Sequence, residues 1–131
     1  ILKNKLSFKN IHTMVGPDAE IRGDINLNEG LIIYGKVYGS ISSGGDIRIG
    51  KTGKVYGDIK AHNIHIGGKV FGNVTIDDKA ELGKYSTLDG DLIYKQLHIE
   101  EGAKFQGQCT ILNEQDNLKQ NISDNTLEEP L

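Results

Sequence analysis

The most regular feature of the chain is a short apolar motif that recurs along most of its length. Its central copies are GKVYGSI at 35–41, GKVYGDI at 53–59 and GKVFGNV at 68–74, and fainter copies precede and follow them. All share the pattern apolar–x–Gly–x–apolar, with the glycine at 23, 39, 57, 72, 90 and 107. Successive glycines are 15 to 18 residues apart. A repeat this short predicts a solenoid in which each copy belongs to one coil.

A second apolar segment lies between successive copies of the motif. It alternates apolar with other residues, as in Ile47-Arg48-Ile49 and Ile64-His65-Ile66, and this two-residue period is typical of a half-buried strand. We therefore predict two short strands per coil, one formed by this segment and one that runs through the motif with its glycine pointing inward. No stretch with helical periodicity separates the strands, which argues against βαβ units. The pattern predicts an all-β fold, a parallel β-helix of about six short coils.

The repeats divide the 131 residues into a core at 13–112 and two flanks, at 1–12 and 113–131. We expect both flanks to be flexible tails, and the C-terminal flank is polar and acidic. The N-terminal flank mixes apolar and basic residues, so it is either a frayed arm or a short segment that contacts anionic membrane lipid. The residues for that membrane contact are Leu2, Lys3, Lys5, Leu6, Phe8 and Lys9.

Composition excludes several functions. The net charge of −3, from 15 basic and 18 acidic residues, argues against a nucleic-acid partner, which favours a strongly basic surface. Cys109 is the only cysteine, so no disulfide or cysteine-based metal site is expected within one chain, and a reducing cytoplasm fits. No apolar run approaches the roughly 20 residues of a membrane-spanning helix.

Two patterns suggest chemistry, and neither predicts a site. Residues 45–52, GDIRIGKT, match the P-loop pattern letter by letter. A P-loop joins a strand to a helix, whereas residues 46–49 and 55–59 both have strand patterns. His65 and His98 occupy equivalent positions two coils apart, about 10 Å at the usual strand spacing, which is too far to share a metal ion. We predict no catalytic residue, no cofactor and no metal, and we expect all four histidines, at 12, 62, 65 and 98, to lie on the surface.

Three outward-facing aromatic residues occupy equivalent positions in adjacent coils: Tyr38, Tyr56 and Phe71. We expect their rings to stack. Such a ladder stabilises its own sheet, and exposed aromatic residues in a row also mark contact surfaces. The sequence leaves open whether this stripe only supports the fold or binds a lateral neighbour or partner.

The ends of the predicted solenoid are the parts with the most unpaired backbone groups and uncovered apolar side chains. A stack of coils ends in open strand edges and an uncovered slice of core unless a cap covers them, and neither flank shows an obvious cap. If like ends meet, each contact is isologous, and a protomer with two such ends forms an open chain. We therefore predict a homopolymer whose interface includes Phe105, Val15 and Ile21.

The opening TMVGPDAEIRGDI at 13–25, the GKVYG repeats and the closing EGAKFQG at 101–107 together resemble the bactofilins, which are bacterial cytoskeletal proteins. The resemblance covers residues 13–109. It implies a right-handed parallel β-helix that polymerises end to end, without nucleotide, into non-polar filaments, with Phe105 at a polymer contact. It also implies a cytoplasmic protein at the inner face of the inner membrane that scaffolds cell-wall or cell-shape enzymes.

Two other functions compete with a scaffold. One is an acyl- or acetyltransferase-like enzyme on a left-handed hexapeptide β-helix. A hexapeptide helix repeats every six residues, whereas the coils here vary from 15 to 18 residues and alternate with period two, and no histidine is placed for catalysis in a cleft. The other is a β-solenoid that binds carbohydrate or cell wall without polymerising.

Overall fold

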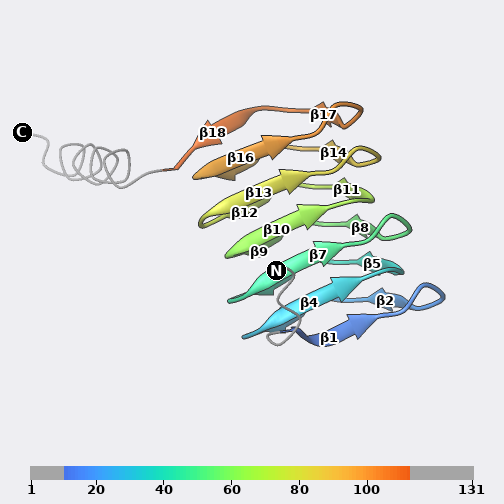
Figure 1. Ribbon diagram of the computed structural model, residues 1–131. Helices are drawn as coiled ribbons and strands as arrows, with labels where there is room; N and C mark the ends of the chain where they lie inside the picture. Colours follow the sequence, from blue (N-terminus) through green and yellow to red (C-terminus); the bar gives the residue numbers. More distant parts are fainter. Residues whose placement is uncertain (1–10, 113–131) are drawn as a thin grey trace, which may run out of the picture.

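The computed structural model describes residues 11–112, which wind through six coils (Figure 1). Each coil contributes one strand to each of three six-stranded sheets, and all strands pair in parallel with the equivalent strand of the neighbouring coil. Sheet A contains β1 (Ile11–Val15), β4 (Gly30–Ile33), β7 (Asp46–Ile49), β10 (Asn63–Ile66), β13 (Lys79–Leu82) and β16 (Gln96–Ile99). Sheet B contains β2 (Glu20–Arg22), β5 (Lys36–Tyr38), β8 (Lys54–Tyr56), β11 (Lys69–Phe71), β14 (Thr87–Asp89) and β17 (Lys104–Gln106). Sheet C contains β3 (Ile25–Leu27), β6 (Ile41–Ser43), β9 (Ile59–Ala61), β12 (Val74–Ile76), β15 (Leu92–Tyr94) and β18 (Cys109–Ile111).

The predicted all-β solenoid of about six coils is therefore confirmed. Strand β1 begins at Ile11, two residues before the predicted start of the core. The six predicted membrane-contact residues and the acidic segment 113–131 lie outside the described residues. Within residues 11–112 there is no helix, and so none that could cross a bilayer.

The prediction of two strands per coil is wrong, because the glycine motif is a corner and not one strand. Gly39 separates β5 from β6 and has a φ of +153°. A Cβ atom at this position would collide with the carbonyl oxygen of Gly23 in the preceding coil. The same collision would occur between Gly57 and Gly39. The motif thus requires glycine because stacked backbones come together too closely at this corner for a side chain.

The residue after most of these glycines ties its corner to the next one. The carboxylate of Asp58 accepts a hydrogen bond of 2.9 Å from the backbone N–H of Asn73. The side-chain oxygen of Asn73 in turn accepts one of 3.0 Å from the N–H of Asp91, whose carboxylate accepts one of 3.1 Å from the N–H of Gln108. This ladder satisfies backbone donors that the interruption between sheets B and C would otherwise leave without partners.

The core consists of apolar ladders that run along the solenoid axis. One ladder joins Val37, Val55, Val70 and Leu88, all of which are fully buried. Burying a side chain of this size contributes about 1.5–3 kcal/mol, so the ladders are the main source of stability. The other fully buried large side chains come from sheets A and C: Leu31, Ile33, Ile41, Ile47, Ile49, Ile59, Ile66, Ile76, Leu82 and Leu92.

Candidate functional site: the two open ends of the solenoid

Among residues 11–112 the apolar ladders stop at the first and last coils, so each end of the described solenoid is a slice through the core. The ladder through Val37 begins at Ile21 and ends at Phe105. The predicted interface residues Ile21 and Phe105 therefore lie at opposite ends of one ladder. No described residue stacks beyond either of them in this sheet.

The C-terminal end is the more exposed of the two. Phe105 is half-buried and packs against the core cluster, next to Leu88. Ile99 is 43% exposed and Ile111 is 52% exposed, whereas Leu82, one coil earlier in the ladder of Ile99, is fully buried. These side chains occupy inward positions and lack only a further coil to cover them.

The N-terminal end has a different surface. Ile21, Ile25 and Leu27 are half-buried and pack against the core cluster. Val15 heads the ladder that ends at Ile99, yet it is only 3% exposed. Val15 thus offers a second copy little surface, and its predicted part in the polymer interface stays a prediction.

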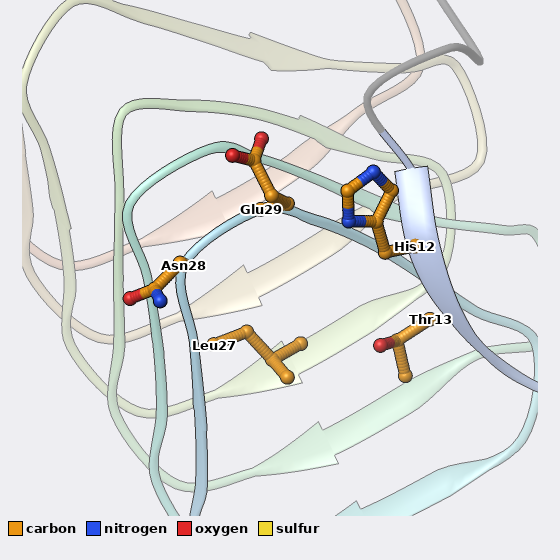
Figure 2. Close-up of a pocket in the computed structure, with 5 residues that line it drawn as sticks. All are labelled: His12, Thr13, Leu27, Asn28 and Glu29. Carbon is orange, nitrogen blue, oxygen red and sulfur yellow. The ribbon is translucent and has the colours of Figure 1, made fainter.

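A hollow of about 330 Å³ opens at the N-terminal end, beside the first corner between sheets C and A. Figure 2 shows the side chains of Thr13 and Leu27 pointing toward one another, while the ring of His12 lies beside Glu29. His12 lies at an irregularity in strand β1, where the register between β1 and β4 shifts. The hollow makes the N-terminal end concave beside Leu27.

The other candidate chemistry takes no part in these ends. Residues 45–52 form strand β7 and the corner before β8, so the expectation that they are no P-loop is confirmed. His65 and His98 lie in one outward row on either side of Glu81, two coils apart as predicted. Burial, followed by the charge of Arg48, lowers the pKa of His65 below its ordinary value. Among residues 11–112, no group of three or more acidic, histidine or cysteine side chains is placed to hold a metal ion.

The aromatic stripe stacks as predicted. The rings of Tyr38 and Tyr56 are 4.9 Å apart and nearly parallel, at 6°, and those of Tyr56 and Phe71 are 5.2 Å apart at 9°. The guanidinium group of Arg22 extends the stack, since it lies 4.7 Å from the centroid of Tyr38. Sequence reasoning missed Arg22, although its position before Gly23 matches that of Tyr38 before Gly39.

A further contact joins two corners that are not in adjacent coils. The ammonium group of Lys51 lies 4.3 Å from the ring centroid of Tyr85, which projects from the corner between β13 and β14. Coil 4 turns between sheets A and B with only Gly67 and Gly68, so the longer corners of coils 3 and 5 can meet across it. In the sequence, the only sign of this contact between Lys51 and Tyr85 was the difference in length between the corners.

The described residues therefore define a parallel β-solenoid whose apolar ladders end at two open faces. A family profile described as "Bactofilin: Polymer-forming cytoskeletal" matches residues 13–110. The chain belongs to the bactofilin family and is a polymer-forming cytoskeletal protein. This family is one of structural proteins, which leaves the acyltransferase alternative without support.

Two solved structures agree with this assignment. Bactofilin from Thermus thermophilus, in a cryo-electron microscopy reconstruction of double helical filaments, is 33% identical with a TM-score of 0.71; the match covers 77% of the present chain and 100% of that one. The crystal structure of a variant of the same protein, with a phenylalanine replaced by arginine, is 32% identical with a TM-score of 0.64; that match covers 67% and 98% of the two chains. A comparison with curated proteins gave no match.

Proposed function

We propose that this protein forms filaments by stacking its open ends, with like ends meeting so that the filament has no polarity. The observation that carries the proposal is the uncovered end of the ladders, where Ile99 and Ile111 are about half exposed at inward positions. A second copy would bury them, as Leu82 is buried within the solenoid.

The energy available at this contact is substantial. Covering the exposed half of an isoleucine contributes about 1 kcal/mol. An isologous contact uses each residue twice, once from each protomer. Ile99 and Ile111 alone then supply about 4 kcal/mol, and Phe105 adds its own exposed part.

The difference between the two ends supports like-to-like stacking. The C-terminal end presents exposed isoleucines, and the N-terminal end presents a hollow and a buried Val15. A contact between unlike ends would have to match these different surfaces, whereas an isologous contact requires each end only to match itself.

Assembly in this scheme needs no nucleotide, because hydrophobic contact and open strand edges supply the attraction. The purified protein should sediment as filaments, visible by electron microscopy, without added nucleotide. A species that stays monomeric at both low and moderate salt would count against the proposal.

Cys109 provides a test of polarity. It is exposed, lies in the last strand at the C-terminal end, and is the only cysteine of the chain. Because burial raises the pKa of its thiol, a short bismaleimide should be applied at mildly alkaline pH. Like-end contacts predict covalent dimers on a denaturing gel, and Cys109→Ser should abolish them. Filaments that give no dimer would show that unlike ends meet.

We further propose that the filament lies on the cytoplasmic face of the inner membrane and organises cell-wall or cell-shape enzymes there. The cytoskeletal description of the family and the Lys and apolar residues of segment 1–12 support this location. Co-sedimentation with anionic vesicles tests it. Replacing Lys3, Lys5 and Lys9 by Ala should reduce vesicle binding without affecting filament formation, and unchanged binding would refute a role for this segment.

A further inference from the structure

One side of the solenoid carries a concentration of positive charge that the overall composition hides. The lysine face, as defined here, consists of the outward residues of sheet B in coils 2 to 5 and the adjoining corners between sheets A and B. It holds five lysines and one acid, a net charge of +4, although the whole chain has a net charge of −3. The lysines are Lys36, Lys51, Lys54, Lys69 and Lys84, and the acid is Asp89.

The charges on this face repel one another. Lys36, Lys54 and Lys69 are in direct register on adjacent strands, so their side chains repeat at the strand spacing of about 4.8 Å, and Glu20 is next to Lys36 at the start of this row. The ion pairs within residues 11–112 are Arg22 with Glu20 and Lys79 with Glu81, and neither includes a lysine of this face. Like charges directly opposite on neighbouring strands destabilise a sheet. An anionic partner would relieve this repulsion.

The aromatic residues of the face restrict the kind of partner. Both faces of Tyr56 are covered by its neighbours in the stack, and Tyr38 is covered by Tyr56 and Arg22. A sugar ring or a nucleic-acid base binds to an open aromatic face. In this stripe only the outer face of Phe71 is left without a stacking neighbour, so the stripe offers little room for either ligand. What the stripe presents outward is ring edges, which carry the positive side of the ring quadrupole, and tyrosine hydroxyl donors.

The neighbouring corner continues the same chemistry. Tyr85 is 61% exposed, with the ammonium groups of Lys51 and Lys84 at 4.3 and 5.6 Å from its ring centroid. Ammonium groups and aromatic edges therefore extend together from sheet B onto the corner between sheets A and B. A partner that lies along this face meets cationic donors over several coils.

We propose that the lysine face binds a carboxylate-rich segment of a partner polypeptide. Carboxylates accept hydrogen bonds both from lysine ammonium groups and from tyrosine hydroxyls. A bilayer fits less well, because the aromatic rings are stacked face to face and Tyr56 is 38% exposed, so the stripe offers little apolar area for insertion. The proposal does not depend on end-to-end polymerisation, since the face lies on the side of the solenoid.

The test measures binding of a fluorescein-labelled oligoglutamate peptide to the full chain by fluorescence anisotropy, near 100 mM salt. The double variant Lys54→Glu with Lys69→Glu reverses two charges of the face. The matched control, Lys60→Glu with Lys95→Glu, makes the same change in net charge on sheet C and at the corner before β16. In the face variant, two lysines that attract the peptide are replaced by two glutamates that repel it, which should weaken binding about tenfold. The control should bind as the unaltered chain does, because charges more than about 10 Å away are screened at this salt.

Several results would overturn the proposal. These are no peptide binding by the unaltered chain, equal weakening in both double variants, or binding of anionic vesicles with the same lysine dependence but without peptide binding. Thermal denaturation verifies that each variant is folded, and sedimentation verifies that each still polymerises. A failure of this proposal is thereby distinguished from a failure of the end-to-end contact.

Discussion

The replacement Phe105→Arg tests the open-end contact most directly. Phe105 is the last member of the ladder that begins at Ile21, and it is half-buried against Leu88. An arginine at this position can keep its aliphatic stem against Leu88 while its guanidinium group reaches water. The fold should therefore lose only about 1 kcal/mol.

The effect on assembly should be far larger. A like-end contact would bring two guanidinium groups from apolar positions into a dry interface, where like charges repel. The effective cost of burying an unpaired ion is several kcal/mol, so two ions cost about 6 kcal/mol or more. At about 1.4 kcal/mol per tenfold change, the contact weakens roughly ten-thousandfold.

The measurement combines sedimentation velocity with negative-stain electron microscopy. Because the N-terminal contact is untouched, non-polar assembly predicts that Phe105→Arg stops at dimers and does not fall to monomers alone. The matched control is Phe71→Arg, which makes the same exchange on the side of the solenoid and should leave filaments intact. Normal filaments from Phe105→Arg, with an unchanged thermal transition, would show that the contact lies elsewhere.

Three further predictions concern the coils themselves. Gly90→Val should destabilise the fold by about 1–3 kcal/mol or more, because the φ of Gly90 is +152° and a Cβ atom would meet the backbone of the preceding coil. Thermal denaturation measures this loss, and Gly16→Ala is the control because a Cβ atom has room at that position. Asp58→Ala should cost about 0.5–1.5 kcal/mol by urea unfolding, since the N–H of the next corner loses its acceptor. Because burial lowers the pKa of His65 in the folded state, the unfolded chain binds more protons, so stability should fall as the pH drops from the ordinary value of 6.5 through the folded pKa. His65→Gln should flatten that pH dependence, and an equally steep profile in this variant would assign it to other groups.

Periodicity was enough to predict the number of coils, because inward positions in a solenoid must be apolar in every turn. It was not enough to place the corner at Gly39. Alternation across Val37, Gly39 and Ile41 looks the same for one continuous strand and for two strands that meet at a bend. The distinction depends on the distance between stacked backbones, which becomes visible only when the coils are assembled.

The functional surfaces were predictable to different degrees. Phe105 stood out because a large ring replaces the valines and leucine of its ladder in the last repeat. The burial of Val15 and the contact of Lys51 with Tyr85 could not be predicted, since both depend on which corners are long and which are short. The charge of the lysine face was present in the sequence, but the net charge concealed it until the strands were placed in register.

The parallel register of the ladders has a consequence for the length of the molecule. Apart from the contact of Lys51 with Tyr85 across coil 4, every coil packs against the coil before it and the coil after it, so the free energy of the rod is close to a sum of nearest-neighbour terms. Duplicating one internal repeat, for example residues 57–71, would insert a new turn whose inward apolar residues and glycine corner meet matching neighbours on both sides. The rod can thus grow by gene duplication without redesign of its tips, and variation in repeat number is tolerated more readily than variation within a repeat.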